Sequence, residues 1–195
     1  MIGTGGQARY QLLALLKVRP IEQVTVWGRR CQAAEQYQRD MAAAGVPVCI
    51  AATAREAVEG AEVVITATSS TGPLIEAGWP ARGAHVTAVG SDMPHKQELD
   101  PRILVAAGKY VPDSIEAAAD SGELHHALKA GLLEAGSVYG ELTAVASGRL
   151  AGRTADDELT VADLTGLGTQ DAAVAALAAR LAGEHGAGQD VPLGE

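Results

Sequence analysis

The sequence predicts an α/β fold with a doubly wound, mostly parallel sheet. Over the first half of the chain, short β-branched runs alternate with amphipathic helical segments, and a glycine-rich turn precedes the first helix. The β-branched runs are apolar throughout, as parallel strands covered by helices on both faces require. The count is about six strands, the usual number for a doubly wound sheet.

The elements follow in order from the amino terminus. Residues 1–2 form a strand stub, and a glycine turn leads into a helix in which Ala8, Leu12 and Leu15 share a face. Only two residues precede Gly3, so the first strand is predicted to be short. Strands are predicted at 23–27, 48–51, 63–66, 84–89, 109–111 and 159–162. Helices are predicted at 30–44, from the Thr53 capping box to 60, after Asp100-Pro101, from Asp113, and at 169–182.

Composition narrows the class of partner. The 15 basic and 24 acidic residues give a net charge of −9, which argues against a nucleic-acid or acidic-membrane surface and favours a small-molecule ligand. The longest apolar runs have strand length and no leader pattern is visible, so a cytoplasmic protein is expected. Cys31 and Cys49 form no Cys-x-x-Cys unit, and the adjacent His125 and His126 diverge on a helix, so no metal site is predicted.

A dinucleotide fingerprint opens the chain. Gly3, Gly5 and Ala8 satisfy the G-x-G-x-x-A spacing of Rossmann folds, where glycines permit a tight turn and let a pyrophosphate approach the helix N-terminus. Such a turn also occurs without a ligand, or with S-adenosylmethionine. Its place before an amphipathic helix and a second strand favours the dinucleotide.

The end of the second strand bears on the choice of cofactor. Sites that prefer NAD carry a carboxylate there for the ribose 2′-hydroxyl, whereas this chain has Gly28 followed by Arg29 and Arg30. Two guanidinium groups suit a 2′-phosphate, so NADP(H) is predicted over NAD(H). The alternative is that both arginines are simply solvated at a helix start.

Two further segments follow strands, at the edge where open α/β sheets bind ligands. Residues 66–70 are rich in Ser and Thr, and they either approach the ribose and nicotinamide or form only a local turn. Residues 90–100 contain Asp92, which is the best-placed candidate for proton transfer, although an Asp near a helix start is also a common cap.

The ordered set of these segments resembles the ornithine cyclodeaminase/mu-crystallin family. The segments that carry the resemblance run from residue 1 to about residue 180: residues 2–9, 24–29, 65–70, 88–99, 122–124 and 163–171. The resemblance implies an NAD(P)-binding Rossmann domain at 1–165. It also implies a C-terminal helix and tail at 166–195 that would pack toward an N-terminal substrate and dimerisation domain, which this chain is expected to lack.

The resemblance also implies roles for residues. Asp92 matches the catalytic aspartate of the family, and Gly166 and Gly168 match a loop near the nicotinamide. Residues implied to bind the cofactor are Gly3, Gly5, Gly6, Gln7 and Ala8 around the pyrophosphate, Gly28, Arg29 and Arg30 around the adenosine ribose, and Thr68 and Ser69 at the second ribose.

The implied activity is that of an NAD(P)-dependent enzyme acting on an amino acid or its cyclic imine, as in a ketimine or pyrroline-2-carboxylate reductase. Alternatives are an ornithine cyclodeaminase, which converts ornithine to proline and ammonia, a non-catalytic NADPH-binding protein like mu-crystallin, or an inactive fragment. The full-length protein would be a homodimer, and this chain alone is expected to be inactive.

Overall fold

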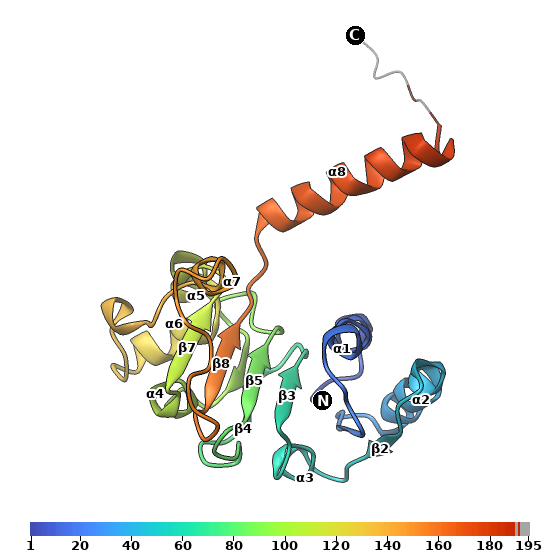
Figure 1. The fold of residues 1–195 in the computed structure, drawn as a ribbon. Coiled ribbons are helices and arrows are strands. Elements are labelled where there is room, and N and C mark those ends of the chain that lie inside the picture. Colours follow the sequence, from blue (N-terminus) through green and yellow to red (C-terminus); the bar gives the residue numbers. More distant parts are fainter. Residues whose placement is uncertain (190, 192–195) are drawn as a thin grey trace. The chain divides into compact units, whose positions relative to one another are not determined.

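The computed structural model describes residues 1–189 and 191, and the chain divides into two compact units, Met1–Thr165 and a second unit that starts at Gly166. In the first unit, strands β3 (Val63–Thr66), β5 (His85–Ala88), β8 (Thr160–Asp163) and β7 (Lys109–Pro112) lie side by side in that order, all parallel (Figure 1). Strands β1 (Val24–Val26) and β2 (Val48–Ile50) form a second parallel pair.

Ile2 joins these two groups of strands. It forms single parallel bridges to Trp27 on one side and to Thr66 on the other. The Ile2 amide donates to the Ile65 carbonyl oxygen at 2.8 Å, and the Ala67 amide donates to that of Ile2 at 2.8 Å. The strand order is therefore β2, β1, Ile2, β3, β5, β8 and β7, so the doubly wound fold and its short first strand are as predicted.

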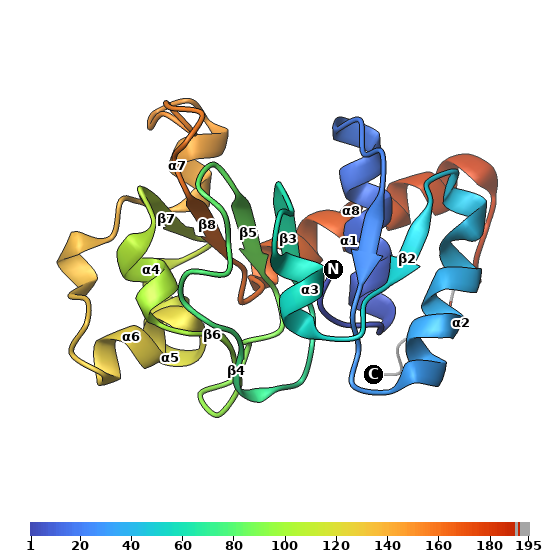
Figure 2. The same cartoon turned by 90° about the horizontal axis from the view of Figure 1, so that it is seen from below.

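Helices cover both faces of this sheet. One face carries α1 (Gly6–Val18) and α2 (Cys31–Met41), with α2 alongside β2 (Figure 2). The other carries α3 (Ala54–Val58), α4 (Arg102–Ala106), α5 (Ile115–Ser121) and α6 (Glu123–Lys129). Adjacent residues of β3 pack into the cores on opposite faces of the sheet. Val64 packs on the face covered by α3 to α6, and Ile65 packs on the face covered by α1 and α2. The remaining helix of this unit is α7 (Leu142–Ala146), and 3-10 turns occupy Ala42–Ala44 and Ala135–Ser137.

A small additional sheet was not predicted from the sequence. Strands β4 (Thr71–Ile75) and β6 (Gln97–Leu99) form a separate parallel pair. β4 is not predicted because Gly and Pro, here Gly72 and Pro73, usually interrupt strands. β6 is not predicted because it lies within a polar segment. β6 lies within residues 90–100, the segment that was expected to include the proton-transfer group.

Two helices begin with hydrogen bonds to side chains that the sequence indicated as caps. The Thr53 hydroxyl accepts the Glu56 amide at 3.1 Å, although the Glu56 carboxylate reaches the Ala52 amide instead of that of Thr53. The Asp100 carboxylate accepts the Arg102 amide at 2.9 Å, and Pro101 lies just before the first helical residue.

The second unit contains α8 (Gly168–His185), three residues longer at its end than the predicted helix. None of its residues is buried, and Val174, Leu177 and Leu181 are exposed on it. Within the described part of the chain, no helix has both the length and the apolar composition needed to cross a bilayer.

Candidate functional site

The glycine turn lies at the carboxyl edge of the sheet. Because all strands of the main sheet are parallel, the segments that follow Ile2, β1, β3 and β5 all meet at this edge. The Gly3 amide donates to the Trp27 carbonyl oxygen at 2.9 Å, which holds the turn against the end of β1. α1 begins at Gly6, with Gly5 as its N-cap residue.

The fingerprint glycines have two different environments. Gly3 has a φ of +116°, and a β-carbon there would overlap the carbonyl oxygen of Ala67 and lie 3.2 Å from Thr68 Cγ2. A β-carbon at Gly5 or Gly6 would meet nothing within 4 Å. Gly3 is thus required by packing against the end of β3, whereas Gly5 and Gly6 leave open space at a helix N-terminus.

The other fingerprint residues divide in the same way. Gln7 is exposed beside the open backbone, whereas the side chain of Ala8 is fully buried in the core beneath α1. Ala8 therefore contributes a small side chain that lets α1 pack closely on the sheet.

Arg9 stabilises the glycine turn by hydrogen bonds to its backbone, a role that sequence reasoning missed. Its guanidinium donates to the carbonyl oxygens of Thr4 at 2.5 Å and Gly5 at 3.0 Å, and it pairs with Asp40 of α2 at 2.5 Å. It also lies over the ring of Tyr37 at 5.4 Å. The hydrogen bond from Arg9 lowers the pKa of the Asp40 carboxyl below its usual value. No motif marks this contact, because Asp40 lies 31 residues away in sequence.

The end of β1 presents the two arginines to solvent. Gly28 is half-buried, and Arg29 and Arg30 are exposed just before α2. Among the described residues, neither guanidinium takes part in a hydrogen bond or an ion pair. Both are therefore available to an anion, and simple solvation also accounts for their exposure.

Thr68 lies between the glycine turn and the segment after β5. Its hydroxyl accepts the Ser70 amide at 3.2 Å, which is the local turn bonding that was the alternative for this segment, and Ser69 is exposed. Its amide donates to the buried Glu98 carboxylate at 2.6 Å, and the Gly90 amide donates to the same carboxylate at 2.7 Å. Sequence reasoning missed Glu98, which lies in the unpredicted strand β6.

Asp92 lies in the turn between β5 and β6. Its carboxylate pairs with Lys96 Nζ at 2.5 Å, and 47% of its side chain is exposed. No helix begins in this turn, so the alternative that Asp92 caps a helix is wrong. The turn is held by the Ser91 hydroxyl and the His126 ring, which contact the Lys96 carbonyl oxygen at 2.8 and 2.7 Å.

The last two predicted residues belong to the second unit. Gly166 has a φ of +85°, which favours glycine, and Gly168 is the first residue of α8.

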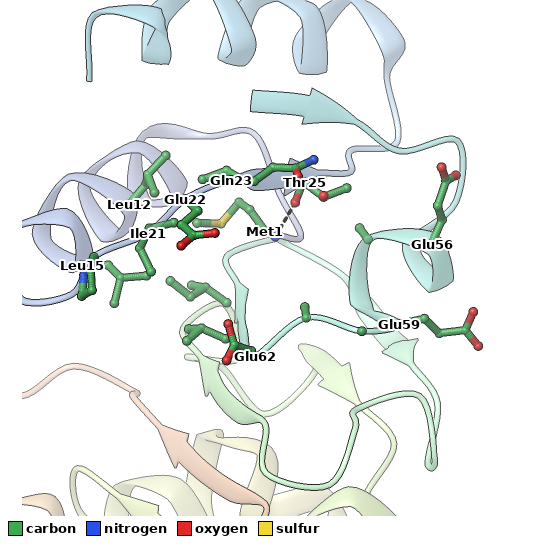
Figure 3. A pocket seen from close by; sticks show the side chains of 17 residues that line it. Met1, Leu12, Leu15, Ile21, Glu22, Gln23, Thr25, Glu56, Glu59 and Glu62 are labelled. Atoms are coloured by element: carbon green, nitrogen blue, oxygen red, sulfur yellow. Dashed lines mark hydrogen bonds between the residues drawn. The ribbon is translucent and has the colours of Figure 1, made fainter. Parts of the chain in front are cut away.

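A cavity of about 470 Å³ lies away from these residues (Figure 3). It is lined by the starts of β1 and β3 and by the end of α3, so it opens at the amino edge of the sheet. The Met1 ammonium donates to the Thr25 carbonyl oxygen there at 2.7 Å, and burial lowers the pKa of this amine to about 5. The glycine turn lies at the opposite edge, so this cavity is no part of the candidate dinucleotide site.

A metal centre finds no support in residues 1–189 and 191, because no group of three His, Cys, Asp or Glu side chains there could hold an ion. The chemistry available at the carboxyl edge is therefore that of open backbone amides, two exposed guanidinium groups and the Asp92–Lys96 pair.

Known proteins resemble this chain over nearly its whole length. An uncharacterized cyclodeaminase of Sinorhizobium fredii is 43% identical over 96% of this chain and 57% of its own length. An archaeal alanine dehydrogenase dimer with bound NAD matches with a TM-score of 0.93 at 35% identity, over 99% of this chain and 59% of the other. A Δ1-pyrroline-2-carboxylate reductase of Thermococcus litoralis, in complex with NADH and L-proline, matches with a TM-score of 0.94 at 33% identity, over 97% and 59%.

The chain thus spans less than three fifths of each of these proteins. The model of the ornithine cyclodeaminase/mu-crystallin family matches residues 1–182, nearly the whole chain. The chain belongs to the ornithine cyclodeaminase/mu-crystallin family.

Proposed function

We propose that this chain binds a nicotinamide dinucleotide for an enzyme that acts on an amino acid or its cyclic imine. The observation that carries the proposal is the open backbone at Gly5 and Gly6, at the N-terminus of α1, with Gly3 packed against the end of β3. Backbone amides at such a helix start suit a pyrophosphate, and any β-carbon there would occupy the ligand's space. The NAD and NADH bound to the two similar proteins support the same class of cofactor.

We further propose that NADP(H) is favoured over NAD(H). Gly28 offers no carboxylate to the ribose 2′-hydroxyl, and the exposed Arg29 and Arg30 have no acidic partner among the described residues. A 2′-phosphate would receive charge-assisted hydrogen bonds from these guanidinium groups.

The proposed chemistry uses Asp92 as the proton-transfer group. When bound, the cofactor supplies hydride transfer between its nicotinamide and the α-carbon of the substrate. The Asp92 side chain is half-exposed beside the segment that Glu98 holds, and its carboxylate contacts Lys96 Nζ, so a proton could be exchanged with a bound substrate there. Reduction of a cyclic imine such as pyrroline-2-carboxylate is the favoured reaction. Cyclodeamination of ornithine is the second candidate, because the Sinorhizobium relative is described as a cyclodeaminase.

Binding is tested by titrating the chain with NADPH and, separately, NADH. Reduced-nicotinamide fluorescence and quenching of Trp27, which follows β1, report the complex. Saturable binding that favours NADPH is the expected result. Tighter binding of NADH would contradict the phosphate clamp but keep the dinucleotide site, and binding of neither would contradict the proposed function.

Turnover separates the candidate activities. A reductase oxidises NADPH when pyrroline-2-carboxylate is added, whereas a cyclodeaminase releases ammonia from ornithine with no net change in the cofactor. A protein that binds NADPH but supports neither reaction would match the non-catalytic alternative. We also propose a homodimer, as one similar protein is a dimer, and sedimentation at micromolar concentration tests it.

A further inference from the structure

Three buried acidic residues form a connected series beneath the carboxyl edge of the sheet. Glu98 of β6, Glu123 of α6 and Asp163 of β8 are each at most 1% exposed. Among the described residues, none of the three pairs with a Lys or Arg side chain. A buried carboxylate without a cation is costly unless hydrogen-bond donors satisfy it, so the position of the donors shows what each residue holds.

Glu98 collects donors from two separate strand ends. One carboxylate oxygen accepts the Thr66 hydroxyl at 2.6 Å and the Gly90 amide at 2.7 Å, and the other accepts the Thr68 amide at 2.6 Å. Thr66 and Thr68 lie at the end of β3, whereas Gly90 follows β5. A single carboxylate therefore ties the Thr68 segment to the segment that leads to Asp92.

Gly90 shows how close this contact is. A β-carbon at Gly90 would lie 2.5 Å from a carboxylate oxygen of Glu98 and would overlap the Thr68 carbonyl oxygen. The backbone of the segment after β5 thus lies directly on the Glu98 carboxylate, with no room for a larger residue.

Glu123 fixes the strand that carries Glu98. Its carboxylate accepts the amides of Glu98 at 2.7 Å and Leu99 at 3.2 Å. Asp163 in turn holds Glu123, because one of its oxygens accepts the amides of Glu123 at 2.9 Å and Leu124 at 3.3 Å, and the Tyr110 hydroxyl at 2.7 Å. The series therefore runs from the main sheet through α6 to the two strand ends.

We infer that Glu98 is a positioning residue that holds the Thr68 and Gly90 segments together to receive the nicotinamide half of the dinucleotide. The inference rests on the proposed function. Gly3 packs against Ala67 and Thr68, so the position of this segment fixes the distance from the glycine turn to the segment of Asp92. Glu98 itself is fully buried, so it would act through the backbone segments that it holds and not by contact with substrate or cofactor.

The position of Glu98 predicts a split in cofactor affinity. The adenosine half would lie at the glycine turn and the end of β1, which Glu98 does not contact, so only the nicotinamide half depends on it. In Glu98→Gln, an amide NH2 replaces one oxygen and faces a donor, so at least one of the three hydrogen bonds is lost. We expect NADPH affinity to fall roughly tenfold or more, while the affinity for adenosine 2′,5′-bisphosphate changes less than about twofold.

Two further variants separate positioning from general stability. Glu158→Gln is the matched control, because Glu158 is a largely buried acid that pairs with Lys109 at 2.6 Å and lies just before β8, at the opposite edge. It is expected to lower stability and to leave both affinities near those of the wild type. Thr66→Val removes only the hydroxyl donor and keeps the branched shape, so it should give a smaller split in the same direction even if Glu98→Gln fails to fold.

The outcomes are distinct. A wild-type chain that binds neither NADPH nor the bisphosphate overturns the proposed function and this inference with it. A wild-type chain that binds both, with Glu98→Gln and Thr66→Val lowering both affinities equally or neither, overturns the inference alone. Faster hydrogen exchange at the Thr68 and Gly90 amides in the variants, together with the split, supports it.

Discussion

Gly28, at the end of β1, lies directly against the side chain of Thr4 in the glycine turn. A β-carbon at Gly28 would come within 2.7 Å of Thr4 Cγ2, so the two segments meet without room for a methyl group. The glycine that takes the place of an acidic residue after β1 thus also has a packing role, which is independent of cofactor choice.

This contact predicts opposite behaviour for two glycine variants. Gly28→Ala should lower the free energy of unfolding by about 1–3 kcal/mol, because Thr4 or the turn must shift. Gly5→Ala should change it by less than about 1 kcal/mol, because a methyl group there meets open space, yet it should weaken NADPH binding. Urea denaturation and fluorescence titration measure both. Unchanged NADPH affinity in Gly5→Ala would place the pyrophosphate elsewhere.

Arg29 offers a test of cofactor choice. Arg29→Ala should weaken NADPH binding by about 1–3 kcal/mol, the loss expected for a charge-assisted pair, and should leave NADH binding nearly unchanged. Arg19→Ala is the control, because Arg19 is an exposed arginine at the end of α1, away from the turn. Equal losses for NADPH and NADH would contradict the 2′-phosphate clamp.

Asp92 offers a test of proton transfer. In a form of the protein that reduces the imine, Asp92→Asn should lower kcat by about 100-fold or more and leave NADPH affinity near normal. Asp120→Asn, at an exposed aspartate of α5, should leave kcat unchanged. Steady-state kinetics with a separate binding titration make the comparison, and undiminished kcat in Asp92→Asn would remove Asp92 from the reaction.

Asp163 predicts a specific dependence of stability on pH. Its burial, and to a smaller extent the charge of Asp113, raise the pKa of its carboxyl to about 7, although bonds from Tyr110 and two amides oppose the rise. Between about pH 4 and pH 7 the folded chain binds a proton that the unfolded chain has released. The contribution of this proton to stability is therefore complete below pH 4 and is lost as the pH rises to 7.

Burial lowers the pKa of the Met1 amine, so this group makes the free energy of unfolding rise as the pH increases from about 5 to 8, opposite to the effect of Asp163. The quantity to measure is therefore the free energy of unfolding of the wild type minus that of Asp163→Asn. This difference should fall by about 2–3 kcal/mol from pH 5 to pH 7.5, since each pKa unit is worth about 1.4 kcal/mol. A difference that stays constant with pH would show that Asp163 is ionised throughout.

The sequence by itself determined the strands of the main sheet, most of the helices between them and the location of the glycine turn. These features depend on local periodicity and on glycine spacing, so β3 was predicted at its observed bounds and the short first strand was visible at residues 1–2. It also placed Asp92 and Thr68 after strands, and parallel pairing then brings such ends to one edge.

Only the tertiary structure decided which residues support that edge. Arg9 meets Asp40 across 31 positions, Glu98 meets Thr66 across 32, and Asp163 meets Glu123 across 40. No local pattern encodes such contacts, because each depends on how separate strands and helices pack. The same limit hid β4 and β6: a strand that contains Gly72 and Pro73 is unfavourable as an isolated segment, and pairing with a distant partner stabilises it.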